Sequence, residues 1–194
     1  MARRKKYEFK PDRRQVTFFK KLYITRLQRQ QLAKWGLLAG LCLLLLVIQN
    51  VIMSRIRFSG AVIDLPVCII LLIGLYEGTE NGSLFALIAS AIYLFSGTAP
   101  GPYAVGLLTA LTILVGLFRQ INWHRSFGSI ALCTCVSIAF YEMATFLIGV
   151  FRGNTIWPRF GVFLLTAGLT CIMVLPFYPL VRAISKIGGD TWKE

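Results

Sequence analysis

Six long apolar segments, separated by short polar or glycine- and proline-rich stretches, constrain this chain more than any other feature of its sequence. They cover residues 34–52, 61–76, 82–95, 102–118, 128–151 and 159–181. Hydrophobic residues make up 56% of the chain and charged residues only 15%, so a single water-soluble core could not hide the apolar surface. The sequence therefore predicts an all-α, polytopic membrane protein.

The lengths of the segments indicate how many of them cross the bilayer. A helix needs about 20 residues to span ~30 Å of hydrocarbon, and the first, fifth and sixth segments meet this requirement. The second and third segments are short and could form one re-entrant hairpin. We expect two full crossings instead, because Glu77, Glu80 and Asn81 supply a polar turn between them. The expected fold is a six-transmembrane-helix bundle.

The positive charges predict the orientation of this bundle. The chain has 21 Lys and Arg against 8 Asp and Glu. With the N-terminus in the cytoplasm, the inside segments hold 17 of the 21 basic residues and the outside loops hold Arg55, Arg57, Arg152 and Arg159. Cytoplasmic loops carry the excess of Lys and Arg, so both termini are expected in the cytoplasm. The predicted organisation is a basic tail over 1–33, a transmembrane domain over 34–187 and a short tail over 188–194.

The basic tail carries eleven Lys and Arg against two acidic residues. In its second half, Val16, Phe19, Tyr23 and Leu27 recur at helical spacing, which predicts an interfacial helix over 15–32 against anionic lipid. A charge cluster that only sets the orientation of the chain is the equal alternative. No motif indicates nucleic-acid binding. The candidate lipid-binding residues are Arg3, Arg4, Lys5, Lys6, Arg13 and Arg14.

Residues that could support catalysis or metal binding are scarce. His124 is the sole histidine, and the five cysteines lie within apolar segments and are expected to be small buried side chains. The sequence contains no phosphate loop and no dinucleotide fingerprint. We therefore expect a non-enzyme that has no cofactor and no metal.

Acidic residues near or within the apolar segments are the candidate polar sites, because a charge inside a membrane is costly. Asp64 is expected to cap the second helix, with a functional role as the alternative. Glu142 lies about 14 residues into its helix, roughly 21 Å deep, and should point into the bundle or at a partner helix. A structural polar contact and a transport role are equally open for Glu142. Glu77 is expected to form an interfacial charge pair with Arg119 or Arg125.

The region over 61–120 resembles the rod shape-determining protein MreD. The similar features are the opening Val62-Ile63-Asp64-Leu65, the glycines Gly78 and Gly82 around a polar turn, and a helix that ends in Arg119. Between them lies a loop that resembles the family's Ser-Gly...Pro-Gly loop, formed here by Ser96, Gly97, Pro100 and Gly101. One departure is Tyr93, at a position just before the loop where members of the family often have an acidic residue.

This resemblance implies a non-enzymatic scaffold of the cell-elongation machinery in the bacterial inner membrane. Such proteins bind MreC and work with RodA, a class B penicillin-binding protein and, indirectly, the MreB filament in sidewall peptidoglycan synthesis and cell shape. The family's six-helix fold is similar to that of the substrate-binding subunits of energy-coupling-factor transporters. A vitamin-transporter subunit of that kind is therefore the alternative function.

Overall fold

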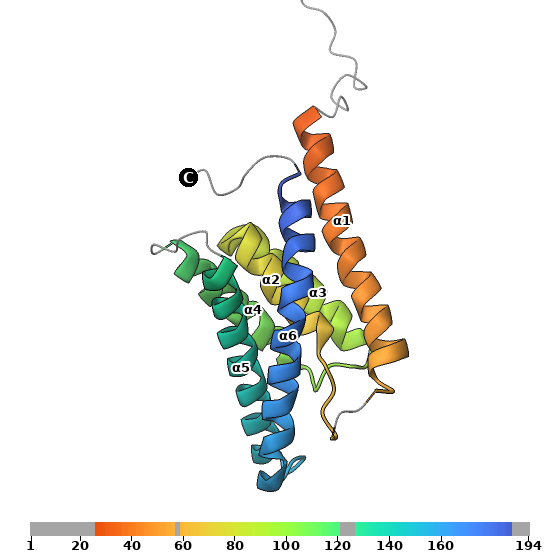
Figure 1. The fold of residues 1–194 in the computed structure, drawn as a ribbon, viewed down its shortest axis with the longest axis vertical. Helices are drawn as coiled ribbons and strands as arrows, with labels where there is room; N and C mark the ends of the chain where they lie inside the picture. Colours follow the sequence, from red (N-terminus) through yellow and green to blue (C-terminus); the bar gives the residue numbers. More distant parts are fainter. Residues whose placement is uncertain (1–25, 57–58, 121–126, 188–194) are drawn as a thin grey trace, which may run out of the picture.

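The computed structural model describes residues 26–56, 59–120 and 127–187, and this part of the chain folds into six α-helices (Figure 1). Two short helical turns, η2 (Gln49–Met53) and η3 (Trp157–Arg159), flank the first and last of them. The helices are α1 (Arg26–Ile48), α2 (Leu65–Glu77), α3 (Thr79–Phe95), α4 (Tyr103–Gln120), α5 (Phe127–Phe151) and α6 (Phe160–Ser185). The described region contains no β-strand.

These helices agree with the six predicted apolar segments, apart from shifts at their ends. The largest shift is at α1, which begins at Arg26 rather than at residue 34. Residues 26–32, assigned above to an interfacial helix, form the start of α1; the remainder of that predicted helix lies outside the described residues. The six basic residues proposed to bind lipid also lie outside them.

Helix α2 occupies the centre of the molecule. It contacts each of the other five α-helices, and all thirteen of its residues are buried. Its sequence is apolar on every side, as expected for a helix with no face toward the surroundings. At about 1.5 Å per residue it extends roughly 20 Å, which is shorter than the hydrocarbon thickness.

A glycine turn joins α2 to α3. Gly78 adopts φ 86°, a left-handed conformation that glycine accepts without strain, and ends α2. Four residues later, a Cβ atom on Gly82 would lie 2.7 Å from the Gly74 carbonyl oxygen and 2.9 Å from the Gly74 Cα. The backbones of α2 and α3 therefore touch beside this turn, and only glycine at residue 82 permits that approach.

The outer surface of the bundle is strongly apolar. Large hydrophobic side chains are more than half exposed on α1, α3, α5 and α6, among them Leu44, Leu84, Leu132 and Leu164. Three helical stretches, Gln28–Met53, Phe127–Phe151 and Trp157–Ser185, are long and apolar enough to cross a membrane. They include the three segments predicted to be long enough. The chain is a helical membrane protein.

The bundle has two ends, which we name by what they contain. At the terminal end, α1 begins, α6 ends and the glycine turn joins α2 to α3. At the loop end lie the connections between α1 and α2, between α3 and α4, and between α5 and α6 (Figure 1). Each end holds a cluster of polar side chains.

Candidate functional site

An extended segment over residues 61–64 leads into α2 at the loop end. Ala61 and Ile63 are buried there, so the polar groups of this non-helical backbone need partners inside the protein. Gln49 supplies two of them: its side-chain amide donates to the Ile63 carbonyl (2.8 Å) and its carbonyl oxygen accepts from the Leu65 N–H (3.2 Å). The Asp64 N–H donates to Thr170 Oγ1 at 3.1 Å. Side chains of η2 and α6 thereby hold the segment in place.

Asp64 caps α2, as the sequence predicted. Its Oδ1 accepts from the Val67 N–H at 3.5 Å, and Pro66 follows within the first turn of the helix. Its other oxygen, Oδ2, accepts a second hydrogen bond of 2.7 Å from the Tyr93 hydroxyl of α3. Asp64 is thus both a cap and a link between two helices.

Tyr93 connects Asp64 to the loop that follows α3. Its hydroxyl lies 3.5 Å from the Thr98 carbonyl, and its own carbonyl accepts from Ser96 Oγ at 2.6 Å. Ser96 Oγ also lies 2.8 Å from Thr98 Oγ1. Gly97 turns the chain with φ 77°. One hydrogen-bonded loop between α3 and α4 therefore contains the four candidate loop residues. Ser96 and Gly97 lie where it leaves α3, and Pro100 and Gly101 lie toward its α4 end.

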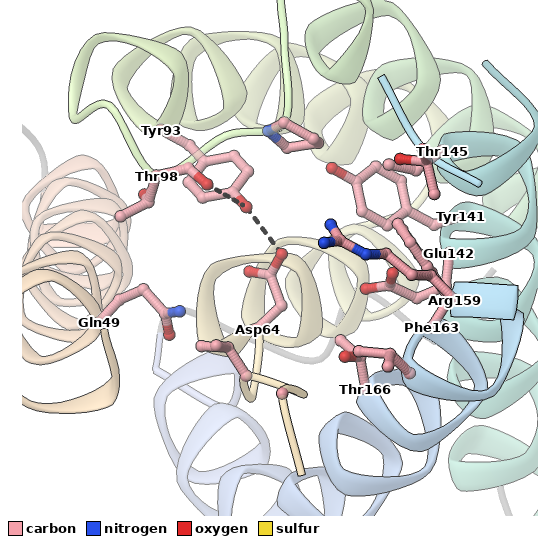
Figure 2. A pocket seen from close by; sticks show the side chains of 15 residues that line it. Gln49, Asp64, Tyr93, Thr98, Tyr141, Glu142, Thr145, Arg159, Phe163 and Thr166 are labelled. Carbon is pink, nitrogen blue, oxygen red and sulfur yellow. Dashed lines mark hydrogen bonds between the residues drawn. The ribbon is translucent and has the colours of Figure 1, made fainter. Parts of the chain in front are cut away.

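Glu142 lies in the wall of a cavity of about 330 Å³ that adjoins this network (Figure 2). Its side chain is buried in α5, in agreement with the predicted inward orientation. Among the described residues, it forms no hydrogen bond and no ion pair. Asp64 lies on the opposite wall, close enough for the two carboxyl groups to interact electrostatically.

Arg159 extends into the same cavity from the connection between α5 and α6 (Figure 2). It is the last residue of η3, and aromatic contacts hold this turn against α5. The ring of Phe146 lies 5.8 Å from Trp157, 5.3 Å from Phe160 and 5.1 Å from Phe163, measured between ring centroids. Arg159 lies between the first two of these partners in sequence and is therefore anchored by its neighbours.

Glu77 belongs to a second polar cluster, at the terminal end. Lys34 Nζ of α1 lies 2.6 Å from Glu77 Oε2, and Ser185 Oγ of α6 donates to Glu77 Oε1 at 3.2 Å. The structure gives Glu77 a cation that the sequence did not indicate, Lys34, and the pair is buried: the Lys34 and Glu77 side chains are 5% and 1% exposed. The side chains of Arg119 and Arg125 lie outside the described residues, so the expected pairing of Glu77 with either of them stays a prediction.

Several residues of the loop-end site are not among the candidates that the sequence predicts. Gln49 is one of them, although a polar residue at the end of a leucine-rich segment is a usable signal. In the sequence, Tyr93 stands out only as a departure from the family pattern, and Arg159 only as a loop charge. Within residues 26–56, 59–120 and 127–187, no three His, Cys, Asp or Glu side chains gather in a way that could hold a metal ion.

Comparisons with known proteins give no further assignment: no family model, no curated protein and no solved structure matches this chain.

Proposed function

We propose that this chain is a membrane scaffold of the MreD type in the bacterial inner membrane. In this proposal all six helices cross the bilayer, both termini lie in the cytoplasm and the bundle binds MreC. Through MreC it works with RodA and a class B penicillin-binding protein and links the MreB filament to sidewall synthesis. The basic tail contributes by binding anionic lipid.

The convergence of separate motifs supports this proposal. The resemblance depends on short pieces of sequence, each of which is common in membrane proteins. Two of these pieces, the opening that contains Asp64 and the loop that contains Ser96 and Gly97, meet in one network through Tyr93. A third piece, the Gly78 and Gly82 pair, forms the turn where α2 and α3 touch. Their order and spacing therefore correspond to one packing arrangement.

The decisive experiment is depletion of this chain in its own host. A scaffold fails by losing its partners, so depleted cells should become round or swollen and sidewall synthesis should be mislocalised. Tagged wild-type chain should retain MreC on purification and restore the rod shape. Tyr103→Phe is a suitable control, because it removes only an exposed hydrogen bond of 3.3 Å to the Pro100 carbonyl and should complement fully.

The same experiment separates the scaffold from the transporter subunit. The polar cavity at the loop end is the observation that favours a transporter. If depleted cells keep their shape but need an added vitamin, the scaffold proposal is wrong and the transporter subunit replaces it.

A further inference from the structure

The loop-end cavity has the position and dimensions of a ligand site. Its volume of about 330 Å³ lies at the small end of the range for ligand pockets in proteins. Residues from all three loop-end connections form its rim, including the exposed Gly60, Pro100 and Arg159. Its inner wall comes from α3, α5 and α6 and from the extended segment. A ligand could therefore enter from the loop end.

Several polar groups in this wall lack a protein partner. Glu142 is 6% exposed and, within the described residues, forms neither a hydrogen bond nor an ion pair. Tyr141 is 1% exposed, and its hydroxyl points into the cavity (Figure 2). Apart from each other, the hydroxyls of Tyr141 and Thr145 have no hydrogen-bond partner in the described part of the chain. Buried groups of this kind are costly unless a partner satisfies them.

Among the described lining residues, positive charge reaches the cavity from one residue at its rim. Arg159 is the sole Lys or Arg of that set, and its guanidinium points toward the middle of the cavity (Figure 2). Among the described residues it forms an ion pair with neither Asp64 nor Glu142, so a gap wider than 4.0 Å separates the opposite charges. The described lining of the cavity thus presents two carboxyl groups and one guanidinium, which extends inward from the rim.

We propose that this cavity binds a zwitterion that carries a primary ammonium group and a phosphate or carboxylate group. The ammonium group lies between Asp64 and Glu142, and the anionic group pairs with Arg159. An ammonium group has three N–H donors, which match the two carboxyl groups and the Tyr141 hydroxyl. A guanidinium binds phosphate or carboxylate through two parallel hydrogen bonds. Binding of such a ligand does not depend on the scaffold function, because it is a property of the purified chain.

Two kinds of molecule carry both an ammonium group and an anionic group of this sort: a water-soluble zwitterion and the headgroup of an aminophospholipid. The test uses the purified full chain in nanodiscs. In one arm, calorimetry measures binding of phosphoethanolamine to chain held in phosphatidylcholine. In the other, native mass spectrometry compares retention of phosphatidylethanolamine with retention of phosphatidylglycerol and phosphatidylcholine. We expect saturable, selective binding in one arm, and the arm identifies the source. Choline compounds should bind at least tenfold more weakly, because their quaternary ammonium group has no N–H donor.

Variants connect the binding to the cavity. Glu142→Gln keeps the size of the side chain but removes its charge, and should weaken binding at least tenfold. Arg159→Gln should weaken it at least fivefold. The matched controls are Arg152→Gln, an exposed arginine of the same connection, and Glu80→Gln, an exposed carboxylate at the terminal end; both should bind within twofold of wild type.

Either of two results overturns the proposal. One is the absence of saturable binding in both arms, or equal binding of choline compounds. The other is wild-type affinity in the Arg159→Gln variant. This second readout holds even if Glu142→Gln fails to fold, because Arg159 is exposed at the rim and its substitution leaves the buried wall intact.

Discussion

Glu77 and Glu142 are both buried carboxylates, but their surroundings differ. Glu77 has a cation at 2.6 Å and a hydroxyl at 3.2 Å, so the protein itself satisfies its oxygens. Glu142 faces a cavity and, in the described chain, has no such partner. Its fixed partners favour a structural role for Glu77. Glu142 faces an open cavity, so its carboxyl group is available to a bound ligand.

Substitution of the Lys34 and Glu77 pair tests its structural role. Removal of one partner leaves an uncompensated buried charge, and such losses cost about 3–5 kcal/mol. We therefore expect Lys34→Met or Glu77→Leu alone to lower the free energy of unfolding by about that amount, measured by equilibrium unfolding in mixed micelles. The double variant should recover most of the loss, because apolar side chains can replace a buried pair.

Glu80→Gln is the control for this prediction. Glu80 is exposed three residues beyond Glu77, so its substitution should change the free energy of unfolding by no more than about 0.5 kcal/mol. Single variants as stable as the control, or a double variant whose loss equals the sum of the single losses, would contradict the assigned role of the pair.

At the scale of elements, the close contact between α2 and α3 can be tested at Gly82, with Gly106 of α4 as the comparison. Gly82→Ala would place a Cβ 2.7 Å from a backbone oxygen, and overpacking of this kind costs roughly 1–3 kcal/mol. Gly106→Ala adds a Cβ with nothing within 4 Å, and should stabilise α4 by about 0.5–1 kcal/mol through helix propensity alone. The two substitutions should therefore shift the unfolding midpoint in opposite directions. A Gly82→Ala protein as stable as wild type would show that α2 and α3 are farther apart.

The helices could be predicted from sequence because long apolar segments interrupted by polar turns leave few alternatives. The Asp64 cap was predictable for a similar reason, since an acidic residue two positions before Pro66 is a local signal. The partners of the charged residues were not predictable. Lys34 and Glu77 are 43 positions apart in sequence, and they meet only because α2 lies at the centre, beside α1. Tyr93 reaches Asp64 for the same tertiary reason.

At the scale of the whole molecule, the arrangement of polar groups follows from a membrane-embedded surface. Leucine-rich faces point outward on α1, α3, α5 and α6, and the two clusters that contain the buried charged side chains lie inside the bundle, one toward each end. The short α2 fits this arrangement because protein surrounds it on every side. At the end of its extended lead-in, Gln49 and Thr170 supply hydrogen-bond partners inside the protein for the Ile63 carbonyl, the Asp64 N–H and the Leu65 N–H.

The two ends of the bundle should lie on opposite sides of the membrane, with the terminal end in the cytoplasm. Lys34, Glu77 and Ser185 meet at the terminal end, so the start of α1 and the end of α6 lie on the same side of the bundle, opposite the loop that contains Thr98. Basic residues favour the cytoplasmic side, and the loop end holds only four of the 21. We therefore expect a fluorescent protein that matures only in the cytoplasm to be active when fused after Asp190. Alkaline phosphatase, which is active only outside, should be active when inserted at Thr98. Each reporter placed at the other site serves as the control and should be silent. Activity of one reporter at both sites would place Thr98 and Asp190 on the same side of the membrane. An even number of crossings would then separate them, whereas six crossings require three, α4, α5 and α6.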